Sequence, residues 1–254
     1  MNPVLESLFK HQSIRKYKNQ PLEQEKLDLI IKAAQAAPNW CNAQHVTIIA
    51  IKDQKRKERF AELCNNQDFI GTCSVFLVFC ADYYRTTYAF QKNGNAELEK
   101  NYVKQLDTLL VGSHEAGIAM QNAVVAAESM GLGTVPIGSI RRNSLDVVKE
   151  LNLPQFVIPI VGLCVGYPDD NPGIKPRLPA KAVYFEDKYD TTNIKSDIDE
   201  FDNEYQKYLA NRSSNERDGN WTKSVNFLYN RNYGKYENDY ELFKQQGFIT
   251  INKN

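Results

Sequence analysis

Apolar residues recur with two different periods along the first third of the chain. Spacings of three and four residues at 2–10 and from Pro21 to about Ala36 predict two amphipathic helices. The β-rich run at 46–51 predicts a strand. The run SVFLVFC at 74–80 contains almost no polar residue, which is typical of a central strand covered on both faces. This pattern predicts helices packed against a sheet.

The middle of the chain continues the alternation of helices and strands. Asp53 is expected to cap a charged helix that runs to about Leu63. The Tyr-rich polar segment after Asp82 predicts a loop, and residues 97–130 predict one long helix. The second half of that helix is apolar nearly all round and rich in small residues, so it belongs in a core or an interface. Gly131 and Gly133 are expected to end it.

Two further strands and one helix are expected before the composition changes. Residues 134–138 predict a short strand, and a helix begins at Asn143 or Ser144 and ends at Pro154. Residues 156–165 predict the last clear strand, in which Pro159 favours an edge position or a bulge.

The C-terminal part is more polar than the rest. Four prolines between 168 and 179 predict a stiff, extended loop, and helices are expected at 197–209 and 239–246. This tail has too few aliphatic residues to form its own core, so it is expected to wrap around the main body or a partner subunit. We therefore predict an α+β fold, with a mixed sheet of four or five strands and helices on both faces. A core at 1–181 and an extension at 182–254 are the expected domains.

Charge and hydropathy exclude several classes of partner. The chain has 31 Lys and Arg and 31 Asp and Glu, so no global positive field attracts nucleic acid or an anionic membrane. The N-terminus lacks the apolar core of a secretory signal. The most apolar stretch, 156–166, is far shorter than the ~20 residues of a membrane span. A cytoplasmic protein is expected.

Five cysteines, an odd number without a CxxC pair, make a disulfide framework and a zinc site improbable. Cys73, Cys80 and Cys164 lie in apolar runs and are expected to be inert. Cys41 lies in a polar loop and is the one thiol worth testing for reactivity.

Well-known catalytic and nucleotide-binding motifs are absent from the sequence. It contains no GxGxxG, no P-loop and no GxSxG. The three histidines are too scattered to indicate a metal site, and His45 and His114 are expected to be structural.

Two short basic segments could bind an anion. In HQSIRKY, the side chains of His11, Ser13 and Arg15 point the same way if the segment is extended. In NPGIKPRLP, flanking prolines hold Lys175 and Arg177 on an extended backbone, which reduces the entropy lost on binding phosphate. A solvated basic turn explains the first segment equally well, and a solvent-facing connector explains the second.

Residues of the polar loop at 38–44, with Gln67 and the turn at 136–141 as possible companions, could read the edge of a heteroaromatic ring. The candidate residues are Asn39, Trp40, Cys41, Asn42, Gln67, Ile137, Gly138 and Ser139. Amides and exposed backbone N–H groups suit that role, and Gly138 allows a planar ligand to approach closely. Ordinary turn chemistry explains each segment about as well.

The loop NRSSNERD contains Arg212 and Arg217, which could hold a second phosphorylated ligand. A solvated loop is the alternative.

Three motifs occur in the same order in the nitroreductase superfamily: HQSIRKY, AAESMGLGTVPIGSIR and VGLCVGYPDDNPGIKPRLP. The chain resembles the branch of NADPH-linked flavin reductases and oxygen-insensitive nitroreductases. The resemblance runs from His11 to Pro179 and continues more weakly through Trp221. It implies an intertwined homodimer with tightly, non-covalently bound FMN at the subunit interface.

The resemblance also implies a role for each candidate residue. His11, Ser13, Lys175 and Arg177 would hold the FMN phosphate, and Arg15 would lie by the pyrimidine side of the flavin. The 39–42 loop and Gln67 would surround the ring, partly from the other subunit, and 137–139 would offer backbone N–H groups near its reactive nitrogen. Arg212 and Arg217 would bind the 2′-phosphate of NADPH.

Two positions depart from the pattern of the family. PNWCN replaces a run that is often rich in serine, and Pro136 replaces an aromatic residue of some relatives.

The implied activity is a ping-pong transfer of hydride from NADPH to FMN and then to a flavin, quinone or nitroaromatic acceptor. No general base is needed, and Arg15 would stabilise negative charge on the reduced ring. Two alternatives stay open. One is an FMN-binding carrier or redox sensor without efficient turnover, and the other is a thiol reductase that uses Cys41.

Overall fold

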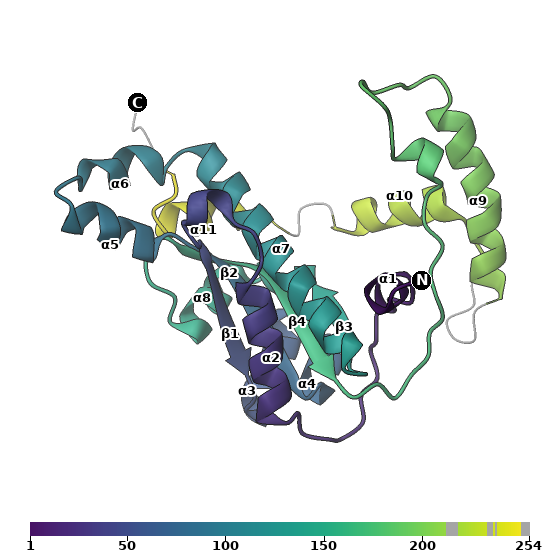
Figure 1. Ribbon diagram of the computed structural model, residues 1–254, viewed down its shortest axis with the longest axis horizontal. Helices are drawn as coiled ribbons and strands as arrows, with labels where there is room; N and C mark the ends of the chain where they lie inside the picture. The colour runs from purple at the N-terminus through teal and green to yellow at the C-terminus, as the bar shows by residue number, and fades with distance from the viewer. Residues whose placement is uncertain (212–217, 233–235, 237, 250–254) are drawn as a thin grey trace. The chain divides into compact units, whose positions relative to one another are not determined.

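The computed structural model describes residues 1–211, 218–232, 236 and 238–249 (Figure 1). Its sheet has four strands in the order β1-β2-β4-β3, and all three ladders are antiparallel. The strands are β1 (Val46–Ile51), β2 (Val75–Asp82), β3 (Gly133–Ile137) and β4 (Val157–Gly166). Among the described residues, the parallel pairing is limited to an isolated bridge between Ser13 and Thr134. The predicted α+β fold with a four-stranded sheet is confirmed.

The helices flank the sheet and build the C-terminal part. They are α1 (Pro3–Phe9), α2 (Gln24–Gln35), α3 (Gln54–Leu63), α4 (Phe69–Thr72), α5 (Tyr84–Lys92), α6 (Glu97–Tyr102), α7 (Leu106–Ser129), α8 (Ser144–Leu151), α9 (Ile194–Ala210), α10 (Trp221–Asn232) and α11 (Asp239–Gln245). Short 3₁₀ turns are η1 (Trp40–Asn42), η2 (Gly138–Arg141) and η3 (Ala180–Ala182).

The chain folds into two compact units. The first consists of Met1–Asp170 and Tyr236–Asn254 and contains the sheet, and the second is Asn171–Lys235. Contrary to the sequence-based expectation, the second unit has a small aromatic core of its own, formed by Phe201, Tyr205 and Leu209. That residues 182–254 wrap around the core or a partner subunit remains a prediction.

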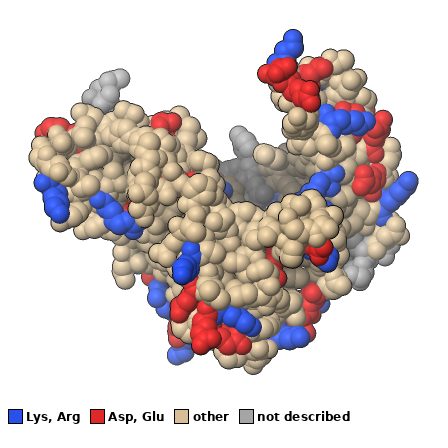
Figure 2. Space-filling view, in the orientation of Figure 1, with Lys and Arg blue, Asp and Glu red and all other residues tan. Residues whose placement is uncertain are grey.

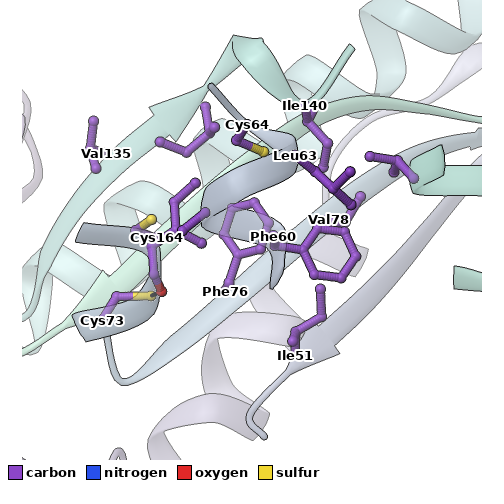
Figure 3. Packing of buried hydrophobic residues seen from close by; sticks show 14 of the residues in the cluster. Ile51, Phe60, Leu63, Cys64, Cys73, Phe76, Val78, Val135, Ile140 and Cys164 are labelled. Carbon is purple, nitrogen blue, oxygen red and sulfur yellow. Dashed lines mark hydrogen bonds between the residues drawn. The ribbon is translucent and has the colours of Figure 1, made fainter. Parts of the chain in front are cut away.

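Strand β2 is buried along its whole length and separates two hydrophobic clusters. Phe76 and Val78 point to the cluster shown in Figure 3, which includes Phe60 of α3 and Ile140 of η2. Leu77, like Val75 and Phe79, points to the opposite cluster, where leucines, isoleucines and alanines of α2 and α7 cover the sheet. Because side chains alternate along a strand, a strand that is buried at every position needs a layer on each face.

The segment after Asp82 is helical, so the predicted loop is wrong. Tyr84–Lys92 forms α5, and the helix predicted over 97–130 is two helices, α6 and α7. Val103, between them, is fully buried in a cluster with Tyr83 and Phe248. Residues 97–111 contain neither Gly nor Pro, so the break coincides with the tertiary packing of Val103 and not with a helix-breaking residue.

Pro159 lies in an interior strand, since β4 pairs with both β2 and β3. The predicted edge position is therefore wrong, but the alternative, a bulge, is confirmed. The β2–β4 register shifts between Phe79, opposite Val161, and Cys80, opposite Pro159. The irregularity accommodates a residue that has no N–H to donate to a ladder.

Some helices begin or end a few residues away from their predicted positions. Helix α2 begins at Gln24 rather than at Pro21, and Gly133 is the first residue of β3 rather than a helix terminator. Gly131, with φ of 77°, does end α7 as predicted.

We predict that Gly162→Ala destabilises the sheet. A Cβ at this β4 position would overlap the Phe76 ring in the core. We expect the free energy of unfolding to fall by about 2 kcal/mol, measured by urea denaturation. In the control Gly71→Ala, the new Cβ would lie 3.6 Å from Glu58 Cγ, an ordinary contact. An equal effect of both variants would contradict the packing argument.

Candidate functional site

The segment that contains His11, Ser13 and Arg15 is extended, as predicted. Ile14 N–H donates to Thr134 O over 2.9 Å, and Ile14 itself is buried. His11 and Ser13 are half-buried and Arg15 is exposed. Since alternate side chains of an extended segment share a face, the three polar groups lie on the side opposite to Ile14.

A carboxylate of α7 holds the His11 imidazole. His11 Nδ1 lies 2.7 Å from Glu128 Oε1, and the Thr134 hydroxyl donates to the same oxygen over 2.7 Å. A carboxylate can only accept, so Nδ1 carries the proton of this contact. The Nε2 atom is therefore the imidazole nitrogen that remains for a ligand.

Arg15 and Gln67 line one open cleft of about 530 Å³, here named the Arg15–Gln67 cleft. Its lining residues are Arg15, Lys16, Tyr17, Asn66, Gln67, Asp68, Phe69 and Thr72. The Gln67 amide donates to Cys64 O over 2.9 Å and also to the Ser139 hydroxyl. The cleft offers a guanidinium and an amide beside aromatic side chains, which suits the polar edge of a flat heterocycle.

The turn after β3 is open to a ligand. Ile137 is buried as the last residue of β3, whereas a Cβ placed on Gly138 would meet no atom within 4 Å. Ser139 is held by its own hydroxyl, which donates to Cys64 O over 3.0 Å. The bond from Gln67 to Ser139 links this turn to the Arg15–Gln67 cleft.

The loop at 39–44 is held in a strained shape by a buried carboxylate. Glu115 of α7, 1% exposed, accepts from the backbone N–H of Trp40 over 2.8 Å and of His45 over 3.0 Å. Its Oε1 atom also lies 3.2 Å from His45 Nδ1. Cys41 and Asn42 adopt φ values of 48° and 57°, a region that non-glycine residues rarely occupy.

The residues of this loop present their side chains outward. Trp40, Cys41 and Asn42 are exposed, and Asn39 is half-buried and accepts from Gln44 N–H over 3.2 Å. His45 is buried and stacks on Tyr83 with ring centroids 4.3 Å apart, which confirms its predicted structural role.

The 39–44 loop and the Arg15–Gln67 cleft lie at opposite ends of the sheet. His45 O accepts from Asp82 N–H at the C-terminal end of β2, whereas Thr72, which lines the cleft, precedes the first residue of that strand. Eight strand residues span ~25 Å. Within one chain, therefore, the predicted ring-binding loop does not come together with Arg15 and Gln67.

The remaining predicted residues belong to the second unit. Lys175 and Arg177 are exposed on an extended segment, and Leu178 beside them packs against the Phe201 cluster. Arg212 and Arg217 lie outside the described residues.

The buried cysteines are not candidates for a catalytic role. Cys73, Cys80 and Cys164 are fully buried, as predicted, and so is Cys64. Burial raises the pKa of the Cys64 thiol to about 12, so it stays protonated and unreactive near neutral pH. Within the described part of the chain, no group of three His, Cys, Asp or Glu residues is arranged to hold a metal ion.

Charges of both signs are interspersed on the face that Figure 2 shows. No helix among the described residues has the length and apolar character needed to cross a bilayer.

Sequence reasoning missed the two glutamates that orient the site. Glu115 and Glu128 are acidic residues in a largely apolar helix, α7. A charge at a buried helical position needs a partner, and that requirement is the signal that could have pointed to them.

Comparison with known proteins gives one consistent result. The model of the nitroreductase family matches residues 8–167, and that of the nitroreductase family C-terminal domain matches residues 175–250. An FMN reductase [NAD(P)H] from Bacillus subtilis strain 168 is 40% identical over 249 residues, which cover 98% of each chain.

Solved structures agree with the sequence relatives. That of NfrA2 from B. megaterium is 39% identical, with a TM-score of 0.93 over 99% of this chain and 100% of the other. The NADPH:FMN oxidoreductase from Vibrio harveyi complexed with NAD⁺ is 32% identical, with a TM-score of 0.84 over 97% of this chain and 98% of the other.

We predict that Glu115→Ala destabilises the fold and loosens the 39–44 loop. The variant leaves two backbone N–H groups and the His45 ring without their acceptor. We expect the free energy of unfolding to fall by about 3 kcal/mol, measured by chemical denaturation. The matched control is Glu62→Ala, because Glu62 pairs with Arg59 on an exposed surface, where such a loss is within about 1 kcal/mol. Similar values for the two variants would refute this role of Glu115.

Proposed function

The chain belongs to the nitroreductase family, and from this premise we propose that it is an FMN-dependent NAD(P)H oxidoreductase that works as a homodimer. The relatives named as an FMN reductase and an NADPH:FMN oxidoreductase support the activity. The observation that carries the proposal is local. The segment of His11, Ser13 and Arg15, joined to β3 by an isolated bridge at Ser13, reaches a cleft whose Arg15 and Gln67 suit a flavin ring.

The residues of this chain fit FMN in their chemistry. His11 and Ser13 would hold the phosphate together with Lys175 and Arg177 of the second unit. Arg15 and Gln67 would bind the pyrimidine edge, and the Gly138 turn has room for the ring because no atom occupies the place of a side chain there. When bound, FMN supplies the chemistry of accepting a hydride and returning two electrons.

Arg15 acts on the energetics of that chemistry. Its guanidinium is always charged and is already turned back toward the 11–15 segment by a 3.2 Å bond to Ser13 O. Placed beside the pyrimidine edge of bound FMN, this positive charge would stabilise negative charge on the ring. No side chain of the site is required as a general base, since solvent can supply the proton.

We infer a homodimer because the predicted flavin-binding residues of one chain lie at two opposite ends of its sheet. The 39–42 loop leads to His45, which pairs with the last residue of β2, whereas Thr72 of the Arg15–Gln67 cleft precedes the first residue of that strand. We infer that the loop completes the site of the partner. Helix α1 supports an interface as well. It has no buried residue, and Val4, Leu5, Leu8 and Phe9 are all more than 40% exposed. Burial of these apolar side chains under a second subunit would be favourable.

We assign the donor and acceptor by class only. Arg212 and Arg217 would bind the 2′-phosphate of NADPH, and an exposed flavin face would accept flavins, quinones or nitroaromatics. A reductase that draws on NADPH would work in the cytoplasm, where that donor is produced. A carrier or sensor without turnover would need no donor site, so Arg212 and Arg217 favour the enzyme.

We predict that Arg15→Ala keeps FMN but is reduced slowly. Loss of the charge removes stabilisation that is greatest in the transition state, so the rate should fall about 100-fold. Anaerobic stopped-flow with NADPH measures it. Lys18→Ala removes an exposed cation that does not line the cleft; it is the control and should stay within about threefold of the wild type. Reduction of bound FMN at the wild-type rate, or loss of FMN binding, would refute the assigned role.

We predict that Arg212→Ala with Arg217→Ala raises the KM for NADPH at least tenfold and leaves the KM for NADH nearly unchanged. The difference arises because NADH lacks the 2′-phosphate that the arginines would bind. Steady-state kinetics with both donors measures the ratio. A KM for NADPH equal to that of the wild type would contradict the assignment of the donor site.

A further inference from the structure

Glu128 is an acidic residue placed where the proposed function needs to bind an anion. Its side chain is 14% exposed and its Oε1 atom accepts from both Thr134 and His11. A carboxylate so close to a phosphate-binding histidine is unfavourable by direct electrostatics, since two negative charges repel each other. Repulsion alone would therefore disfavour a carboxylate at the position of Glu128.

The contact with Glu128 determines which nitrogen of the His11 imidazole can face a phosphate. An imidazole donates from both nitrogens only when both are protonated. With Nδ1 directed at Glu128, a phosphate oxygen can be bound only by a proton on Nε2. Among the described residues, Nε2 of His11 has no hydrogen-bond partner, and the His11 side chain is 26% exposed.

The surrounding structure holds this arrangement rigidly. Thr134 is fully buried in β3, and its backbone binds Ile14 while its hydroxyl binds Glu128. The carboxylate is thus anchored to the same strand that fixes the backbone of the 11–15 segment. Rotation of Glu128 away from His11 would leave a buried hydroxyl without its acceptor, which is costly.

We propose that Glu128 is a positioning residue for the FMN phosphate, acting through His11. It orients the imidazole through Nδ1 and so directs the Nε2 edge of the ring at the phosphate. The inference rests on the proposed function, because it takes His11 as a phosphate ligand. Repulsion alone predicts that removing the charge of Glu128 strengthens FMN binding. The proposal predicts that removing it weakens FMN binding.

The test is the affinity of the apoprotein for two flavins that differ in the phosphate. Quenching of flavin fluorescence gives the dissociation constants of FMN and riboflavin for the wild type and for Glu128→Gln. The amide preserves shape and an acceptor oxygen but removes the charge. We expect FMN to bind roughly tenfold more weakly to the variant, as when a residue that orients a binding histidine is lost, and riboflavin to bind unchanged. Unchanged or tighter FMN binding would overturn the proposal.

A double-mutant cycle separates positioning from general damage. In the His11→Ala background, Glu128→Gln should no longer weaken FMN binding. Equal weakening with and without His11, or parallel weakening of FMN and riboflavin, would show that Glu128 acts by another route and overturn the proposal. Ser129→Ala is the control on the same helix, because Ser129 is exposed and bonds only to Ala126 O. It should bind FMN as the wild type does.

Thr134→Val is the second variant and keeps the test informative if Glu128→Gln does not fold. It preserves volume and removes one of the two bonds that hold Glu128. We expect a smaller, threefold to fivefold loss of FMN affinity with riboflavin unaffected. No change would overturn the proposal. A wild type that binds FMN no better than riboflavin would instead contradict the phosphate site, which belongs to the proposed function.

Discussion

The complete burial of β2 is the constraint on which the rest of the structure depends. Eight consecutive buried residues leave no face of this strand for solvent, so helices must cover both sides. The site residues are therefore found at the two ends of the sheet rather than on its faces. The Arg15–Gln67 cleft lies at the end where β2 begins, and the 39–44 loop lies where it ends.

Helix α7 connects these two ends through its acidic residues. Glu115 holds the 39–44 loop and Glu128 holds His11. Thirteen residues of α-helix span ~20 Å, close to the length of β2. One helix thus positions both halves of the site, and in the proposed dimer each complete site would contain one half from each subunit. The apolar remainder of α7 packs on β2 and β4, so the carboxylates are fixed to the core.

The parts of the fold predicted from sequence are those in which one local signal dominates. The uninterrupted apolar run identified β2, and Asp53, which accepts from Arg56 N–H, marked the start of α3. The errors arose where distant contacts decide the structure. The polar, Tyr-rich composition of α5 led to the prediction of a loop. The break between α6 and α7 occurs where Val103 is buried in a cluster with Phe248, which is far away in sequence.

The candidate site was predictable to a similar extent. Alternation predicted that His11, Ser13 and Arg15 share one face, and Arg15 and Gln67 line one cleft. Their roles around FMN remain a proposal. Glu115 and Glu128 were missed because, apart from Thr134, their partners are backbone N–H groups and two histidines at least 70 residues away in sequence. Lys175 and Arg177 lie in a separate unit, so their meeting with His11 remains a proposal.

The most direct test of the account is an absorbance spectrum of the purified protein, followed by anaerobic addition of NADPH and, separately, NADH. The account predicts a flavin spectrum that NADPH bleaches, and that NADH bleaches more slowly. A flavin spectrum that neither donor bleaches would contradict the proposed reductase and leave a flavin carrier. No flavin, even after FMN is added back, would contradict the assignment of the Arg15–Gln67 cleft itself.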